Sequence, residues 1–275
     1  MNPPRIPGKI FGIIGHPLSQ TLSPLLHNWG YERLGVPAAF AAFPTPPERL
    51  DEVIRAVRAL PVSGLSVTIP HKEAVMPLLD GLSPLAGRTG AVNTLAWEGG
   101  RLIGHNTDVT GFLAPLKAMG EPPESALLLG AGGAAKAVLA GLAEIGVADV
   151  TVCNRDFERA KALAGRFGVN AVAWDRRDTV DARLVVNSTP MGMKGKAEGE
   201  SPIPAGYWVP GHIAYDLVYN PLETAFLKDA SAAGARTVDG LEMFAGQGAA
   251  QFKLWTGLDL PMDEARALLR QALGI

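Results

Sequence analysis

The chain has 275 residues, of which 47% are hydrophobic and 19% are charged, a balance typical of a folded globular protein. Its formal net charge of −2 provides no basic excess for the phosphates of a nucleic acid, and its single cysteine, Cys153, cannot form a disulfide within the chain. These values exclude a disulfide-stabilised secreted domain and argue against nucleic-acid binding. The length accommodates two domains.

The apolar stretches are too short to cross a membrane or to form a secretory signal. Residues 126–143 are the most apolar, but Lys136 and several glycines interrupt them, well short of a clean span of about 20 residues. Near the N-terminus, residues 10–15 form too short an apolar core for a signal peptide. We therefore expect a cytoplasmic protein with no membrane contact.

The first part of the chain predicts strands that alternate with helices. Short apolar or β-branched runs predict strands at 9–14, 38–43 and 62–68, and amphipathic runs predict helices at 23–34 and 47–59. This first α/β layer is expected to end near Asp108.

Two local signals refine this layer. Ser23 followed by Pro24 is typical of an N-cap and the first residue of a helix. Residues 91–97 and 101–105 flank Glu98-Gly99-Gly100, which predicts a β-hairpin.

After a helix at 110–119, a turn-rich joint at 120–124 begins a second α/β rhythm. The strands predicted beyond it are 125–129, 150–153, 184–186 and 213–217, with helices at 134–145 and 157–167. This rhythm predicts a doubly wound parallel sheet. The helices predicted at 241–255 and 263–273 are expected to pack on the first layer.

A glycine loop, Gly130-Ala131-Gly132-Gly133-Ala134, lies between the predicted strand 125–129 and the helix that follows. Glycines let backbone N–H groups approach a pyrophosphate, and the helix N-terminus adds its positive dipole end. The loop departs from G-x-G-x-x-G, because its third glycine is Gly133, and no Ser or Thr follows Lys136 as a Walker loop requires. The plain alternative is a tight β–α turn.

The end of the next predicted strand bears on which dinucleotide binds. It reads Cys153-Asn154-Arg155-Asp156, with Arg159 one helical turn further. Arginines accommodate the 2′-phosphate of NADP, whereas a carboxylate such as Asp156 favours the ribose hydroxyl of NAD. Both cofactors stay open on these residues, and Arg159 could instead be a solvated helix residue.

Polar side chains follow the strands of the first layer. Thr21 and Ser23 offer hydroxyls at a helix N-terminus, and Thr68 and Lys72 lie at the end of the third strand and just beyond it. Asn93 lies in the first strand of the predicted hairpin, and Asp108 follows the hairpin. Ligands of open α/β sheets bind beyond the carboxyl ends of strands, so these groups could converge. Each has a plain reading as well: Lys72 as a solvated charge, Asp108 and Ser23 as helix caps. The scattered histidines do not support a metal site.

Ordered motifs along nearly the whole chain resemble the shikimate dehydrogenase family. The matching segments are Gly15-His16-Pro17, Thr21-Leu22-Ser23-Pro24, Val67-Thr68-Ile69-Pro70-His71-Lys72, Gly90-Ala91-Val92-Asn93-Thr94, Gly104-His105-Asn106-Thr107-Asp108, Gly130-Ala131-Gly132-Gly133-Ala134, Asn154-Arg155, Asn187-Ser188-Thr189-Pro190-Met191-Gly192-Met193, Asp216-Leu217-Val218-Tyr219-Asn220-Pro221, Asp239-Gly240-Leu241-Glu242-Met243 and Gln247.

The resemblance implies a two-domain α/β protein, with residues 1–108 and 241–275 as the substrate domain and 109–240 as a Rossmann-like NADP domain. It implies Lys72 and Asp108 as the catalytic pair. The substrate contacts that it implies are Thr21, Ser23, Thr68, Asn93, Asp108, Tyr219 and Gln247. The cofactor contacts that it implies are Gly130, Ala131, Gly132, Gly133, Ala134, Asn154, Arg155, Asp156, Arg159, Leu217, Gly240 and Met243.

The activity implied is the reversible NADPH-dependent reduction of 3-dehydroshikimate to shikimate, in the route to aromatic amino acids. Three positions depart from the family pattern: Thr21 replaces a serine, Ser66 an asparagine and Asp156 a threonine. An NAD-dependent quinate/shikimate dehydrogenase and a non-catalytic sensor of the same fold stay open as alternatives. A methyltransferase, which could use a similar glycine loop, would not need the Lys72 and Asp108 pair. The resemblance permits a monomer or a homodimer.

Overall fold

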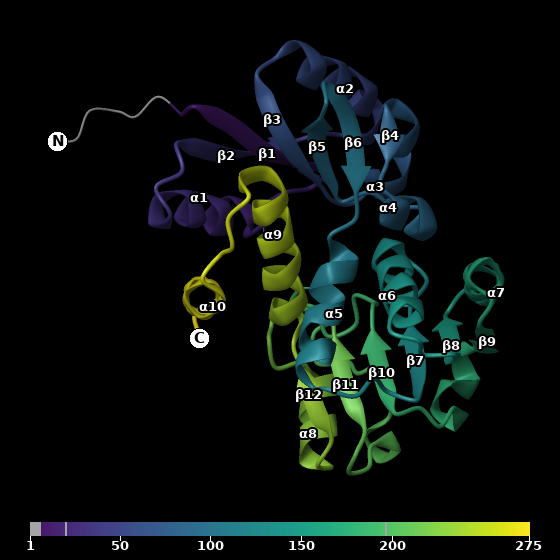
Figure 1. Ribbon diagram of the computed structural model, residues 1–275. Coiled ribbons are helices and arrows are strands. Elements are labelled where there is room, and N and C mark those ends of the chain that lie inside the picture. Colours follow the sequence, from purple (N-terminus) through teal and green to yellow (C-terminus); the bar gives the residue numbers. More distant parts are fainter. Residues whose placement is uncertain (1–6, 20, 196) are drawn as a thin grey trace. The chain divides into compact units, whose positions relative to one another are not determined.

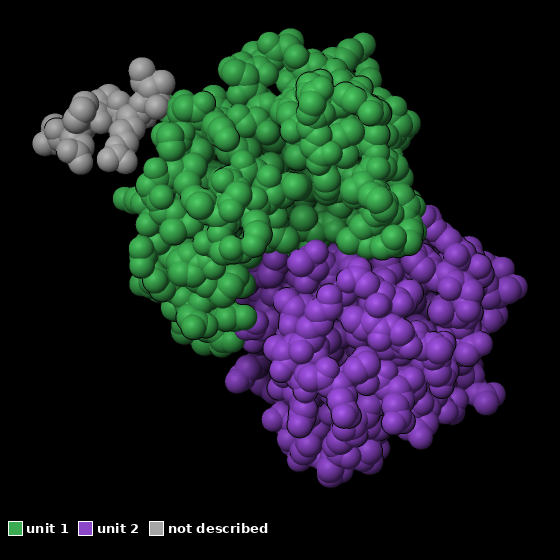
Figure 2. Space-filling view, viewed as in Figure 1, with its two compact units in different colours: residues 1–107, 247–275 green, residues 108–246 purple. Residues whose placement is uncertain are grey.

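The computed structural model describes residues 7–19, 21–195 and 197–275, which form two compact α/β units (Figures 1 and 2). Unit 1 comprises Met1–Thr107 and Gln247–Ile275, and unit 2 comprises Asp108–Gly246. The sequence places the second boundary at residue 241, six residues earlier. The division falls inside helix α9 (Gly240–Thr256), because its first turns pack on helix α5 (Asp108–Ala118): a Cβ at Gly246 would lie 3.0 Å from the Cα of Gly111.

The sheet of unit 1 has the strand order β2-β1-β3-β5-β6-β4. Its strands are β1 (Lys9–Gly15), β2 (Ala38–Pro44), β3 (Val62–Val67), β4 (Gly81–Leu82), β5 (Thr94–Glu98) and β6 (Arg101–His105). Strand β1 pairs in parallel with β2 and β3, and β5 pairs antiparallel with β3 and β6. Gly99 and Gly100 have φ values of 56° and 80°, as a two-residue turn between β5 and β6 requires, which confirms the predicted hairpin.

Helices flank this sheet. They are α1 (Ser23–Arg33), α2 (Leu50–Ala59), α3 (His71–Ala74), α4 (Pro84–Thr89) and α10 (Met262–Ala272), together with the end of α9. Helix α2 buries Ile54 and Val57 in a core with Leu65 and Leu95 of the sheet. Arg33 of α1 makes two hydrogen bonds to Glu264 of α10, at 2.8 and 3.0 Å.

The expected role of Ser23 as N-cap is wrong. Helix α1 begins at Ser23 itself, Leu22 stands at the cap position, and no side-chain cap hydrogen bond is present among the described residues. Pro24 therefore lies in the first turn, where its missing N–H is tolerated.

In unit 2 the strands lie in the order β12-β11-β10-β7-β8-β9, all parallel. They are β7 (Ser125–Leu129), β8 (Asp149–Asn154), β9 (Asn170–Ala173), β10 (Leu184–Asn187), β11 (Ile213–Asp216) and β12 (Arg236–Val238). Numbered within the unit, this is the 3-2-1-4-5-6 order of doubly wound dinucleotide-binding sheets, with the switch point between β7 and β10 (Figure 1). The predicted doubly wound sheet is confirmed.

The helices of unit 2 are α5, α6 (Gly133–Glu144), α7 (Phe157–Phe167) and α8 (Ala225–Ala232), together with the first turns of α9. Helices α5 and α6 approach closely at Gly141, where a Cβ would lie 2.9 Å from the ring of Phe112. A core of unit 2 includes Leu127 of β7, Val185 of β10 and Phe226 of α8. No helix in the described part of the chain is both long and apolar enough to span a bilayer.

Candidate active site

Two hydroxyl groups lie together where strand β1 gives way to helix α1 in unit 1. The Thr21 hydroxyl donates to Ser23 Oγ at 3.3 Å and accepts a hydrogen bond from the Ser23 backbone N–H at 3.3 Å. Ser23 is buried, with 4% of its surface exposed. Paired hydroxyls at the positive end of a helix suit a small carboxylate.

Lys72 lies on the short helix α3, after a turn that backbone and side-chain bonds hold in place. Thr68 N–H donates to Ile14 O at 2.9 Å, and His71 N–H donates to Thr68 O at 2.9 Å. The buried imidazole of His71 donates from Nε2 to Thr45 O at 2.7 Å, so His71 packs within the turn. Lys72 O accepts from Val92 N–H at 2.7 Å, which anchors its backbone independently of its amine.

Asn93 is held at the start of strand β5. Its Oδ1 accepts from the Thr94 hydroxyl at 2.8 Å and from Thr107 N–H at 2.7 Å, and its Nδ2 donates to Thr107 Oγ1 at 2.9 Å. All three residues are buried in unit 1. Asp108 follows Thr107 as the first residue of α5, and it is also buried.

The sequence did not single out a buried amide next to this cluster. Gln251 of α9 bonds to Asn93, Thr94, Ser66 and His27. The sequence selects Gln247, one helical turn earlier on the same helix and the first residue of the returning segment of unit 1. Helical spacing from Gln247 was the signal that could have identified Gln251, because residues four apart lie on one face of a helix.

Gly130 and Gly132 of the loop in unit 2 have different structural reasons to be glycine. Gly130 has φ 110°, and a Cβ there would lie 2.5 Å from Ser188 Oγ, so the fold itself requires glycine. Gly132 has φ −92°, and a Cβ there would meet no described protein atom within 4 Å. The space beside Gly132 therefore suits a ligand that comes close to the backbone.

The N-terminus of α6 completes this loop. Gly132 is its N-cap, and because glycine has no side chain, the N-cap residue makes no side-chain bond to the first-turn N–H groups. Such N–H groups, at the positive end of a helix, bind phosphate oxygens. The loop lies at the end of β7, beside the switch point of the sheet, and thus fits the pyrophosphate of a dinucleotide.

Asp156 acts as the N-cap of helix α7. Its carboxylate accepts a hydrogen bond from Arg159 N–H at 3.2 Å, and Asn154 Nδ2 donates to Asp156 O at 3.0 Å. Threonine, which the resemblance implies at this position, is also a capping residue, so Asp156 preserves the helix start. The side chains of Arg155 and Arg159 are exposed beside this cap.

A buried carboxylate fastens the ends of strands β10 and β11. Asp216 accepts hydrogen bonds from the Thr224 hydroxyl at 2.6 Å, Asn187 Nδ2 at 2.9 Å and Val218 N–H at 3.0 Å. Burial nevertheless raises the pKa of Asp216 to about 6, because desolvation outweighs these bonds. The loops that start at Asn187 and Asp216 are thereby tied together.

The start of α9 lies against the segment after β11. A Cβ at Gly240 would lie 2.6 Å from the Val218 carbonyl carbon and 2.7 Å from that of Leu217, so glycine is required for this contact. Tyr219 packs on Phe244 at 5.3 Å between ring centroids, and burial raises the pKa of the Tyr219 phenol. Unit 2 thus brings Leu217, Tyr219, Gly240 and the buried Met243 into one region.

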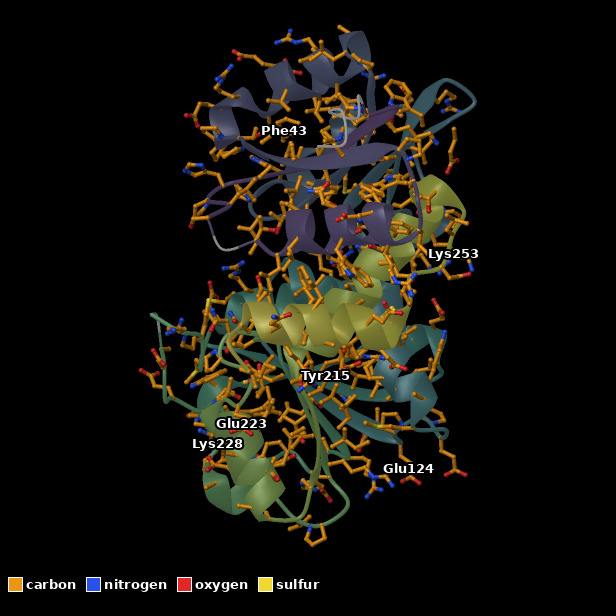
Figure 3. The ribbon with its side chains drawn as sticks, turned by 90° about the vertical axis from the view of Figure 1, so that its left-hand side faces the viewer. Phe43, Glu124, Tyr215, Glu223, Lys228 and Lys253 are labelled. Carbon is orange, nitrogen blue, oxygen red and sulfur yellow. The ribbon has the colours of Figure 1, made fainter. Side chains whose placement is uncertain are left out.

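A cavity of about 530 Å³ lies at the opposite, amino-terminal edge of the same sheet. Its described lining residues are Met119, Glu121, Pro122, Pro123, Glu124, Arg183, Ile213 and Arg236; Glu124 is labelled in Figure 3. None of the predicted site residues is among them. In doubly wound sheets the ligand binds beyond the carboxyl ends of the strands, so this cavity is separate from the candidate site.

The parallel 3-2-1-4-5-6 sheet and its open glycine loop define a dinucleotide-binding α/β protein, to which a second α/β unit with clustered hydroxyls, an amide and a lysine is joined. Three family models match the chain. They are the shikimate dehydrogenase substrate binding domain over residues 13–95, shikimate / quinate 5-dehydrogenase over 118–187, and the shikimate 5'-dehydrogenase C-terminal domain over 240–270. The chain belongs to the shikimate dehydrogenase family, as its motifs indicate.

Similar proteins span the whole chain. Shikimate dehydrogenase (NADP(+)) from Oleidesulfovibrio alaskensis is 56% identical over 275 residues, which cover 99% of each chain. The crystal structure of shikimate 5-dehydrogenase from Thermus thermophilus in complex with NADP(H) and shikimate has a TM-score of 0.88 and 43% identity, covering 96% of this chain and 99% of that one. Quinate dehydrogenase from Corynebacterium glutamicum in complex with NAD has a TM-score of 0.90 and 32% identity, with coverage of 96% and 99%.

Proposed function

We propose that this chain is an NADP-dependent shikimate dehydrogenase that interconverts 3-dehydroshikimate and shikimate. The observation that carries the proposal is the full-length match to an NADP(+)-dependent relative at 56% identity. The open glycine loop and the uncapped start of α6 support it, because they suit a dinucleotide.

In this proposal unit 2 binds the cofactor. Residues 130–134 hold the pyrophosphate, Asn154, Arg155 and Arg159 surround the adenosine ribose and its 2′-phosphate, and Leu217, Gly240 and Met243 contact the nicotinamide end. When bound, NADP supplies hydride chemistry, and the protein supplies orientation and one proton.

Unit 1 supplies most of the substrate contacts in this proposal, and Tyr219 and Asp108 belong to unit 2. Thr21, Ser23 and Tyr219 hold the substrate carboxylate, and Thr68, Asn93 and Gln247 bind ring hydroxyls. Lys72 donates a proton to the oxygen of the ketone during reduction and removes it from the hydroxyl during oxidation. Asp108 accepts hydrogen bonds from the Lys72 ammonium and from a substrate hydroxyl, which fixes their geometry and balances the charge of the lysine.

Steady-state kinetics on the purified protein test this function. Shikimate or quinate is combined with NADP or NAD, and we expect the highest kcat/KM for shikimate with NADP. A higher kcat/KM for quinate with NAD would establish the alternative that Asp156 favours, and no turnover with any pair would indicate a sensor.

We also propose a cytoplasmic location and a homodimer. The buried free thiol of Cys153 supports a reducing compartment.

The proposed homodimer is supported by strand β2, which is an outer strand of its sheet. Residues 41–43 of this strand are exposed and uncharged, including Phe43 (Figure 3). Such an unprotected strand edge pairs readily with another chain. Light scattering on the wild type should give a dimer mass, and Ala42→Lys should give a monomer; a monomeric wild type would contradict the dimer.

A further inference from the structure

Gln251 lies at the centre of a buried polar network in unit 1. Its Nε2 donates to Asn93 O at 3.2 Å and to Thr94 Oγ1 at 2.9 Å, and its Oε1 accepts from Ser66 Oγ at 2.8 Å and pairs with His27 Nε2 at 3.3 Å. Only 1% of its surface is exposed. An amide offers two donors and two lone pairs, so these described partners match its whole capacity.

The chemistry of its neighbours allows one orientation of this amide. A backbone carbonyl only accepts, so Nε2 must face Asn93 O, and Oε1 must face Ser66 and His27. His27 must then carry its hydrogen on Nε2. This agrees with a fully buried imidazole whose pKa burial lowers to about 4, and whose Nδ1 has no hydrogen-bond partner among the described residues.

The orientation of the Gln251 amide also determines the orientation of the Asn93 amide. Because the Thr94 hydroxyl accepts from Gln251, it can direct its own hydrogen to Asn93 Oδ1, 2.8 Å away. Thr107 N–H donates to the same oxygen at 2.7 Å. The oxygen of Asn93 is thus committed to the protein, and Nδ2 becomes the donor end of the side chain.

We propose that Gln251 is a positioning residue for the substrate: through Thr94 it fixes the Asn93 amide so that Asn93 binds a ring hydroxyl of shikimate as a donor. This inference rests on the proposed function and on the role of Asn93 in it. Ser66 belongs to the same network, because its hydroxyl donates to the oxygen of Gln251 and holds the amide in this orientation.

If Gln251 only stabilised the fold, removing another buried hydrogen bond of α9 would have the same effect on shikimate binding. Trp255 lies one helical turn further along α9 and donates from Nε1 to Leu95 O at 3.0 Å, which also fastens α9 to strand β5. Among the described residues, Trp255 makes no hydrogen bond to Asn93, Thr94 or Thr107; its indole N–H bonds to Leu95 instead. Trp255→Phe therefore removes a buried bond of the same helix without touching the orientation of Asn93, and it is the matched control.

The experiment compares full-length Gln251→Leu, Trp255→Phe, Asn93→Ala and the Gln251→Leu/Asn93→Ala double variant. We expect Gln251→Leu to raise the KM for shikimate by about tenfold or more and to leave the KM for NADP within about twofold. Trp255→Phe should lower the Tm and leave both KM values within about twofold. The double variant should bind shikimate no more weakly than Asn93→Ala, because Gln251 acts through Asn93.

Three results would overturn the inference. They are a shikimate KM in Gln251→Leu no higher than in Trp255→Phe, additive effects in the double variant, and an unchanged KM in Asn93→Ala. In each case shikimate turnover by the wild type would leave the proposed function standing. If Gln251→Leu does not fold, Ser66→Ala replaces it, with an expected rise in shikimate KM of roughly two- to fivefold; an unchanged KM would again overturn the inference.

Discussion

The proton transfer proposed for Lys72 can be tested at a single side chain. Lys72→Met keeps the length of the side chain and removes its proton, so we expect kcat to fall by about 10² to 10⁴ while KM for shikimate stays within several-fold. The backbone bond from Val92 N–H to Lys72 O, 2.7 Å long, does not depend on the amine, so the fold should survive. Kinetics beside circular dichroism check both points, and an unchanged kcat would leave Lys72 as a surface charge.

Ser23 allows a cleaner test than the sequence indicates, because its side chain does not cap α1. We expect Ser23→Ala to weaken shikimate binding by about 1 to 3 kcal/mol, the loss of a hydrogen bond to a charged group, with little change in Tm. KM and thermal unfolding measured together check this. A lower Tm with an unchanged KM would show that the hydroxyl only supports the helix.

The raised pKa of Asp216 implies that the free energy of unfolding depends on pH. Its folded pKa of about 6 lies above its ordinary value of 3.8, so the folded state holds the proton more tightly and stability falls as pH rises between these values. Asp216→Asn can keep the bonds from Asn187 and Val218 and can donate to Thr224. We expect the variant to gain roughly 1 to 2 kcal/mol over the wild type between about pH 5 and about pH 7.5.

Urea unfolding of both proteins at the two pH values measures this gain. The comparison cancels the other titrating groups, including His27, whose lowered pKa makes stability rise with pH between about 4 and 6.5. A difference between wild type and variant that does not change with pH would show that Asp216 is ionised throughout this range.

Elements with strong periodicity could be predicted from the sequence to the residue. Strand β7 and helix α7 have the predicted bounds, because a buried apolar run and an amphipathic repeat each specify one structure. Strands β9 and β12 were missed. They have four and three residues, and of these only Val238 is buried. Pairing with β8 and β11 therefore forms these strands, because their own residue pattern is too weak to specify them.

Residues at the start of helix α7 allow a prediction about the preference for NADP over NAD. Asp156→Thr keeps a cap on α7 and removes a negative charge beside Arg155 and Arg159, so the ratio of kcat/KM for NADP over NAD should rise. Arg155→Ala should lower that ratio, because an exposed cation near the 2′-phosphate is lost. Both changes should shrink as salt is raised.

Kinetics with both cofactors at low and high salt measure these ratios. Glu158→Gln is a matched control, since it removes a neighbouring exposed charge of α7 that pairs with Lys161. A ratio that moves as much in this control as in Asp156→Thr would indicate a general charge effect rather than recognition of the 2′-phosphate.

Across the whole molecule, the sequence could suggest candidate site residues but not the hydrogen bonds that hold them. Motifs indicated Lys72, Asn93 and the glycine loop, because unusual residue types at fixed spacing are visible in a sequence. Gln251 was missed, since its partners Ser66 and His27 are 185 and 224 positions away along the chain. Burial and partner geometry arise only when distant segments fold together.

We expect NADP to bind mainly to unit 2 and shikimate mainly to unit 1, and hydrogen exchange can test this. Each unit has its own core, with Leu65 and Leu95 in unit 1 and Leu127 and Val185 in unit 2, so a ligand should suppress local opening mainly in the unit that binds it. We expect NADP alone to slow amide exchange in residues 130–136 and shikimate alone to slow it in residues 66–72. The reverse pattern would contradict the assignment of cofactor to unit 2, because amides at the start of α6 are the groups that a bound pyrophosphate would occupy.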